Sequence, residues 1–227
     1  DGGSDNDTIL GSRGDDLLLG GAGNDLLDGR QGTDVVLAGA GDDTFVWDPG
    51  DGSDVVEGQA GVDTMVFFGS NAGENIDIVA NGGRIWFLRD VAAVAMDLND
   101  VEQIDFRALG GADNIVVGDL TGTDVTLIAL DLRGTNGTVD GQPDTLTING
   151  TQGDDVFGAA GDVGGITIFG LQATVNVVGQ EQAHDRLVLN ALGGADVVDA
   201  NALAAGSVQL VINGGLGADV LIGSAGD

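Results

Sequence analysis

The chain has 227 residues with 42 Gly, 2 Pro and no Cys, and 37 acidic side chains against 7 basic ones give a formal net charge of −30. This charge argues against nucleic acid and anionic membrane surfaces as partners, and the lack of Cys excludes disulfides as a source of stability. No apolar run reaches the roughly 18 residues of a membrane-spanning helix. So acidic a chain either stays expanded, presents a solvated acidic surface or binds cations.

Residues 2–66 repeat with a period of nine. Five uninterrupted nonamers fill residues 2–46, and after two inserted residues, Trp47 and Asp48, two more follow at 49–57 and 58–66. The eighth position of each nonamer is apolar and the sixth is always Asp. The sixth-position residues are Asp7, Asp16, Asp25, Asp34, Asp43, Asp54 and Asp63. A merely solvated acidic surface would not require one fixed position, so the pattern favours cation binding.

Each nonamer predicts a turn followed by a short strand. The first six residues are rich in Gly, which adopts positive φ easily, and the last three direct one apolar side chain inward. Two nonamers then complete one coil, and alternate repeats lie above one another. Along one edge of the stack we expect a column of Asp7, Asp25 and Asp43, and along the other Asp16 and Asp34. The insertion at Trp47 is expected to disturb this register for Asp54 and Asp63.

The pattern G-G-x-G-x-D-x-U-x, where U is a large apolar residue, resembles the repeats of the RTX (repeats-in-toxin) calcium-binding family. Residues 20–28 match it at every fixed position, and the pattern returns at 214–222, with Asp219 in sixth place. The resemblance implies calcium ions between successive turns and export through a bacterial type I secretion channel.

Stacked carboxylates need cations between them, and calcium takes six to eight oxygen ligands. Sixth-position Asp side chains and turn carbonyls from two stacked repeats can supply these oxygens. We therefore predict several calcium ions. The predicted metal ligands are Asp7, Asp16, Asp25, Asp34, Asp43, Asp54, Asp63 and Asp219.

The middle of the chain lacks complete nonamers but has a longer period. Residues 144–157 align with 185–198 at an offset of 41, and ALGGAD occurs at both 108–113 and 191–196. We interpret these similarities as repeated units of roughly two coils each. Their shortened glycine turns put Asp113, Asp155 and Asp196 at matching positions, where solvated acids fit the sequence as well as calcium ligands do.

The predicted fold is therefore all-β: a parallel β-roll or β-helix (a β-solenoid) with Gly/Asp-rich calcium-binding turns. We expect an RTX-like β-roll at 1–66, a degenerate β-helix of 41-residue repeats at 67–213, and resumed repeats at 214–227. A separate middle β-domain is the alternative. Strands are expected at runs such as 125–130, 166–169 and 207–212.

Catalytic chemistry has few candidates in this sequence. His184 is the only His, which excludes a two-His metalloprotease helix. No G-x-S-x-G elbow exists for a Ser-His-Asp triad. Some parallel β-helices cleave acidic polysaccharides with calcium and Arg, but Arg84, Arg89 and Arg107 flank apolar runs and are expected to form salt bridges. We predict that the chain is not an enzyme.

These features predict a structural or adhesive segment of a secreted or cell-surface bacterial protein, in a filament, surface layer or adhesin, that folds on meeting extracellular calcium. Open strand edges predict end-to-end contacts with further copies. The alternative is a calcium-dependent folding and secretion module attached to a toxin or hydrolase. An ice- or carbohydrate-binding face would need a ladder of Thr or aromatic residues, which is missing. Because residue 1 reads as the end of a repeat, we expect a longer protein around this segment.

Overall fold

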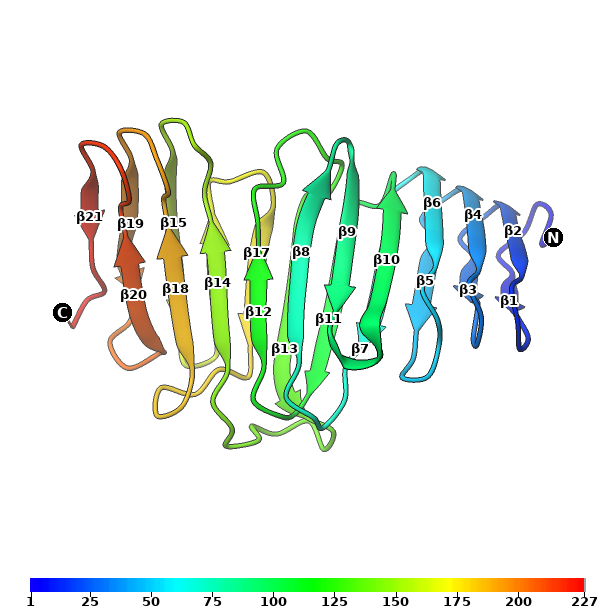
Figure 1. Ribbon diagram of the computed structural model, residues 1–227, viewed down its shortest axis with the longest axis horizontal. Helices are drawn as coiled ribbons and strands as arrows, with labels where there is room; N and C mark the ends of the chain where they lie inside the picture. The colour runs from blue at the N-terminus through cyan, green and yellow to red at the C-terminus, as the bar shows by residue number, and fades with distance from the viewer. Residues whose placement is uncertain (227) are drawn as a thin grey trace.

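The computed structural model describes residues 1–226. They form a flattened stack of coils whose strands make up two long sheets, with the two ends of the chain at opposite ends of the stack (Figure 1). In the order of their hydrogen bonding, the 11-stranded sheet holds β1 (Thr8–Leu10), β3 (Leu26–Asp28), β5 (Thr44–Trp47), β7 (Thr64–Phe68), β11 (Gln103–Leu109), β13 (Leu127–Gly134), β17 (Thr174–Val178), β16 (Gly165–Phe169), β15 (Val156–Asp162), β19 (Val197–Leu203) and β21 (Val220–Ile222). The 10-stranded sheet holds β2 (Leu17–Ala22), β4 (Val35–Ala40), β6 (Val55–Ala60), β10 (Val94–Asn99), β9 (Arg84–Arg89), β8 (Asn75–Asn81), β12 (Asn114–Val117), β14 (Thr145–Asn149), β18 (Arg186–Asn190) and β20 (Gln209–Asn213). The all-β parallel solenoid predicted from the repeats is confirmed.

From β1 to β7 the chain alternates between the sheets, and each strand pairs in parallel with the strand one coil later. The inserted residues at Trp47 do not disturb this register, because Val35 pairs with Val55 and Thr44 with Thr64. The turn that follows β5 takes up the extra length. The indole N–H of the fully buried Trp47 donates to the Gly52 carbonyl at 2.8 Å and ties down this longer turn. The expected disturbance is therefore wrong.

Two antiparallel meanders interrupt the parallel stack, one in each sheet. In the first, β9 runs antiparallel to β8 and β10, whose outer edges pair in parallel with β12 and β6. In the second, β16 runs antiparallel to β15 and β17, which pair in parallel with β19 and β13. Because the first meander lengthens one sheet and the second lengthens the other, the two sheets stay in step along the stack.

The 41-residue period is a true register, since Thr145 pairs with Arg186 and Asn149 with Asn190. This unit is a single coil, however, and not two coils: between β14 and β18 the chain passes through the other sheet as the second meander. The two ALGGAD copies precede β12 and β19, which belong to different sheets, so they lie on opposite edges of the stack. The prediction of equal two-coil units is wrong, because the hexapeptide repeats the chemistry of a turn and not its place in a coil.

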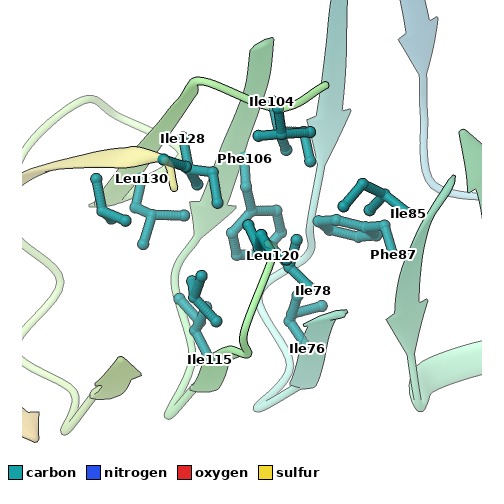
Figure 2. Close-up of a cluster of buried hydrophobic side chains, with 14 of the residues drawn as sticks. Ile76, Ile78, Ile85, Phe87, Ile104, Phe106, Ile115, Leu120, Ile128 and Leu130 are labelled. Atoms are coloured by element: carbon teal, nitrogen blue, oxygen red, sulfur yellow. The ribbon is translucent and has the colours of Figure 1, made fainter. Parts of the chain in front are cut away.

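The core fills the space between the sheets with apolar side chains from alternate strand positions. Figure 2 shows one part of it, where β8, β9 and β12 of one sheet face β11 and β13 of the other. The labelled side chains there are Ile76, Ile78, Ile85, Phe87, Ile104, Phe106, Ile115, Leu120, Ile128 and Leu130. Burying a side chain of this size contributes about 1.5–3 kcal/mol.

An aromatic stack strengthens the core beside the first meander. Trp47 lies parallel to Phe67 with ring centroids 4.0 Å apart, and Phe87 tilts against Phe67 at 4.4 Å.

Among residues 1–226 the only helical element is the 3-10 turn η1 (Val91–Ala93), and none of these residues forms a helix long and apolar enough to cross a bilayer.

Candidate metal-binding turns

The sixth-position carboxylates form two ladders of hydrogen bonds along the stack. In each ladder, one carboxylate oxygen accepts the backbone N–H of the sixth residue one coil earlier. The first column precedes the strands of the 11-stranded sheet and links Asp7 to Asp25 (2.8 Å), Asp25 to Asp43 (2.7 Å) and Asp43 to Asp63 (2.8 Å). The second column precedes the strands of the 10-stranded sheet and links Asp16 to Asp34 (2.8 Å) and Asp34 to Asp54 (2.9 Å). The columns expected from the nine-residue period are present and extend to Asp54 and Asp63.

Both columns continue through the middle of the chain, where acids outside complete nonamers take the same place. The first column runs from Asp63 to Glu102 and resumes as Asp155, Asp196 and Asp219. The second resumes as Glu74, Asp113, Asp144 and Asp185. Sequence reasoning did not select Glu74, Glu102, Asp144 or Asp185. The signal for Asp144 and Asp185 was present, since these two residues open the segments that align at the 41-residue offset.

Asp113, Asp155 and Asp196 do not all occupy matching positions, as the sequence had suggested. Asp155 and Asp196 share the first column, whereas Asp113 belongs to the second. Nor are the turns that end at Asp113 and Asp196 shortened. Each is a six-residue turn whose second residue, Leu109 or Leu192, takes the positive φ (65° and 71°) usually left to Gly.

Burial sets these carboxylates apart from ordinary turn acids. Asp25, Asp34, Asp43, Asp54 and Asp63 are all buried, while Asp7, Asp16 and Asp219, in the end coils, are partly buried. In most of them only one oxygen is used, and the other is buried without a hydrogen-bond partner in the described part of the chain. The unpartnered oxygens are Oδ2 of Asp7, Asp25, Asp34, Asp43, Asp54, Asp63, Asp113 and Asp196, and Oε2 of Glu74.

A buried, unpaired carboxylate is strongly unfavourable, so each must hold a proton or face a cation. Burial raises the pKa of Asp63 to about 6, of Asp54 and Asp113 to about 7, and of Asp144 to about 8. Repulsion from neighbouring carboxylates of the same columns adds to each rise, whereas the backbone N–H that each accepts opposes it. Near neutral pH these carboxylates therefore either keep a proton or ionise next to a cation.

The unpartnered oxygens face backbone carbonyls of the next coil. A Cβ placed on Gly2 would lie 2.6 Å from Oδ2 of Asp7 and 2.6 Å from the carbonyl oxygen of Gly20. At Gly20 the same position faces Oδ2 of Asp25 and the carbonyl of Ala38. Glycine in first position thus lets Oδ2 of the sixth-position acid and a backbone carbonyl of the next coil come close together, and both are oxygen ligands of the type that calcium prefers.

A family model for the RTX calcium-binding nonapeptide repeat matches this chain in four copies, at residues 1–36, 28–46, 50–66 and 211–227. The chain carries RTX repeats. These repeats bind calcium and form a parallel β-roll, in agreement with the unpartnered carboxylate oxygens that lie near carbonyls of the next coil. No curated protein matches the sequence.

Each column supplies one carboxylate per coil, which explains why no three His, Cys, Asp or Glu side chains of residues 1–226 come together at one point. Calcium held in an RTX turn of this chain would take carbonyl oxygens for much of its coordination, with the sixth-position carboxylate as the charged ligand.

The fifth position of the RTX turns carries a second ladder that the pattern search missed. The side-chain oxygen of Asn6 accepts the backbone N–H of Asn24 (2.8 Å), and that of Asn24 accepts the N–H of Asp42 (3.0 Å). In these bonds the backbone N–H of the later coil donates to a side chain of the earlier coil, which is the opposite direction to the sixth-position ladder. Neighbouring coils are therefore linked by hydrogen bonds in both directions. The family pattern leaves this position free, and only the recurrence of Asn and Asp there could have indicated its role.

Proposed function

We propose that this chain is a structural or adhesive segment of a secreted or cell-surface bacterial protein, and that its RTX turns bind several calcium ions whose binding drives folding outside the cell. The observation that carries the proposal is the set of buried carboxylate oxygens without partners. Extracellular modules bind calcium with dissociation constants of about 10⁻⁴–10⁻³ M. Where the site does not exist in the unfolded chain, the free energy of binding becomes free energy of folding.

The charge of the chain supports a folding step that takes place after export. With a formal net charge of −30, the calcium-free chain repels itself, and stacking the two columns brings its acids closer together. We therefore expect little folded protein in a calcium-poor cytosol. Calcium outside the cell would remove the repulsion and lock the coils in register.

We further propose that the segment has no catalytic activity of its own. The Arg residues that a polysaccharide-cleaving solenoid could use are engaged with acids of the chain: Arg84 with Glu57 (2.8 Å), Arg107 with Asp105 (2.9 Å) and Arg89 with Glu74. The single His184 is exposed. These pairings support a structural role for the cationic side chains.

End-to-end association of copies is part of the proposal. The last coils expose Leu216 (81%) and Val220 (52%), and at the other end of the stack Leu17 is 62% exposed. Further coils laid on these ends, whether from a longer chain or from a second copy, would cover the apolar side chains and pair the strand edges. If the calcium-bound chain stays monomeric, the alternative gains support, namely a folding and secretion module serving a toxin or hydrolase.

The test compares two neighbouring carboxylates in calcium titrations followed by circular dichroism and electron microscopy. Asp43 is a buried sixth-position residue, whereas Asp42 is an exposed fifth-position residue whose Oδ1 accepts the N–H of Val62 at 2.9 Å. Asn at either position keeps a hydrogen-bond acceptor and removes the charge. Asp43→Asn should raise the calcium concentration needed for folding and Asp42→Asn should leave it unchanged. Full β structure of the wild-type chain in chelator would refute the calcium trigger.

A further inference from the structure

The second residue divides most of the six-residue turns into two classes. The turns before Glu74 and Asp144 belong to neither, since Ser70 and Asp140 lack positive φ and their N–H groups do not donate to the acid four residues on. In the first class this residue has positive φ, and Oδ2 of the sixth-position carboxylate is buried without a hydrogen-bond partner. The second residues of this open class are Gly3, Gly21, Arg30, Gly39, Gly50, Gln59, Leu109 and Leu192. They belong to the turns that end at Asp7, Asp25, Asp34, Asp43, Asp54, Asp63, Asp113 and Asp196. Gly215, with φ of 86°, gives the turn before Asp219 the same conformation.

In the second class the turn closes on its own carboxylate. Ser12, Thr151 and Glu181 do not adopt positive φ, and their backbone N–H groups donate to Oδ2 of the acid four residues on. The distances are 2.7 Å from Ser12 to Asp16, 2.6 Å from Thr151 to Asp155 and 2.6 Å from Glu181 to Asp185. The hydroxyl groups of Ser12 and Thr151 add further bonds of 3.0 Å to the same carboxylates.

The two classes have a simple conformational cause. Rotation of the backbone at the second residue turns its N–H toward the carboxylate or away from it. Gly reaches the left-handed region at little cost, whereas Ser and Thr favour negative φ and form local hydrogen bonds with nearby acids. In a closed turn, Oδ2 is therefore already satisfied by neutral donors, and a cation would have to displace them. In an open turn, nothing in the described chain competes for Oδ2.

We propose that the second residue of each turn selects which turns of this chain bind calcium: open turns take the ion through Oδ2 of their sixth-position acid, and turns closed by Ser12, Thr151 or Glu181 do not. The inference rests on the proposed function, since it presupposes that calcium binds to the turns. It extends calcium binding beyond the segments matched by the family model, to the open turns that end at Asp113 and Asp196. It also predicts that one turn inside the matched segments, the turn that ends at Asp16, does not bind calcium.

Single substitutions can convert one class into the other. Ser12→Gly changes residues 11–16 into GGRGDD and Thr151→Gly changes 150–155 into GGQGDD, both of which match the full family pattern. Gly50→Ser is the reverse change, in the turn that ends at Asp54. A Cβ on Gly50 would have no atom within 4 Å, so its main effect is to disfavour the φ of 117° on which the open turn depends.

The experiment counts calcium ions bound per full-length chain by equilibrium dialysis at saturating calcium, with folding checked by circular dichroism. Ser12→Gly and Thr151→Gly should each bind about one ion more than the wild type, and Gly50→Ser about one ion fewer. The matched control is Ser4→Gly, at the exposed third position of the first turn, which adds the same backbone freedom and should leave the count unchanged.

Each outcome separates the two hypotheses. A wild-type chain that binds no calcium overturns the proposed function, and this inference with it. A wild-type chain that binds calcium, with folded Ser12→Gly and Thr151→Gly variants that bind no more than it does, overturns the inference alone. The two gain variants lie in an end coil and in the middle of the chain. Failure of one to fold therefore leaves the other, together with Gly50→Ser, to decide.

Discussion

The guanidinium of Arg89 is buried against the carboxylate of Glu74 inside the core. Both side chains are nearly inaccessible to solvent, and Nε of Arg89 lies 3.0 Å from Oε1 of Glu74 while its Cζ lies 5.4 Å from the centre of the Trp47 ring. Arg89 ends β9, the central strand of the first meander, at the point where the second column is interrupted between Asp54 and Glu74. The charge of Arg89 thus neutralises Glu74, the first acid of the second column after this interruption.

Replacing Arg89 with Met should destabilise the calcium-bound chain by about 3–5 kcal/mol, because it leaves Glu74 buried without its partner. Urea unfolding followed by circular dichroism measures the loss. The control is Arg133→Met, which removes an Arg paired with Asp131 at the surface and should leave the stability nearly unchanged.

A second variant separates charge from packing at this position. Adding Glu74→Gln to Arg89→Met removes the stranded charge, so the double variant should regain part of the lost stability. A single Arg89→Met variant as stable as the wild type would contradict a neutralising role for this pair.

Without calcium, the chain should be more stable at pH 5 than at pH 8. Burial raises the pKa of Asp63, Asp54, Asp113 and Asp144 to about 6, 7, 7 and 8, above the value of 3.8 for a free side chain. An acid whose pKa is raised by folding stabilises the fold fully below its unfolded pKa and loses that contribution as the pH rises through the folded pKa. Protons should therefore substitute for calcium, and the stability should fall between about pH 5 and pH 8.

The β content of calcium-stripped protein at the two pH values, measured by circular dichroism, tests this expectation. With saturating calcium the dependence should weaken or reverse, because the ion binds the ionised carboxylates. A stripped protein that is more stable at pH 8 than at pH 5 would show that the columns are not the main titrating groups.

The parallel coils could be predicted from the sequence because a fixed sixth-position Asp and an eighth-position apolar residue together determine the turn, the strand and the inward face. The meanders could not be predicted this way. Strands such as β9 alternate inward and outward residues as parallel strands do, and their direction depends on which neighbours they pair with. One local signal was available, since Gly82 and Gly83, the two-residue loop between the paired Asn81 and Arg84, are a Gly-Gly pair typical of a hairpin turn, and Gly82 has φ of 67°.

The candidate site was predictable to the same extent. The sixth-position acids follow from the period, but the equivalent role of Glu74 depends on its place above Asp113, which lies 39 residues away. The class of each turn was hidden as well. Arg30 and Gln59 adopt the conformation of Gly, whereas Ser12 does not, and the family pattern alone does not separate these cases.

The fifth-position ladder should contribute measurably to stability. Asn24 accepts the N–H of Asp42 and donates its own N–H to Asn6, so Asn24→Ala should cost about 1 kcal/mol, the typical value of one lost hydrogen bond. Asn24→Asp keeps the acceptor oxygen and serves as the matched variant, with little loss expected at high calcium. Equal losses for the two variants would mean that the hydrogen bond to Asp42 is not the source of the effect.

The two Trp residues give separate reports on folding. Trp47 is fully buried and stacked on Phe67, whereas Trp86 is 43% exposed on the outer face of β9. In a Trp86→Phe variant, the emission of Trp47 should move to shorter wavelength as calcium is added, with the same midpoint as the gain of β structure, because burial of the indole and ordering of the coils are one event. The Trp47→Phe variant leaves Trp86 as the reporter and should show a much smaller shift. If Trp47 already emits at the shorter wavelength in chelator, the coils around β5 fold without calcium, and the trigger must act on other turns of the stack.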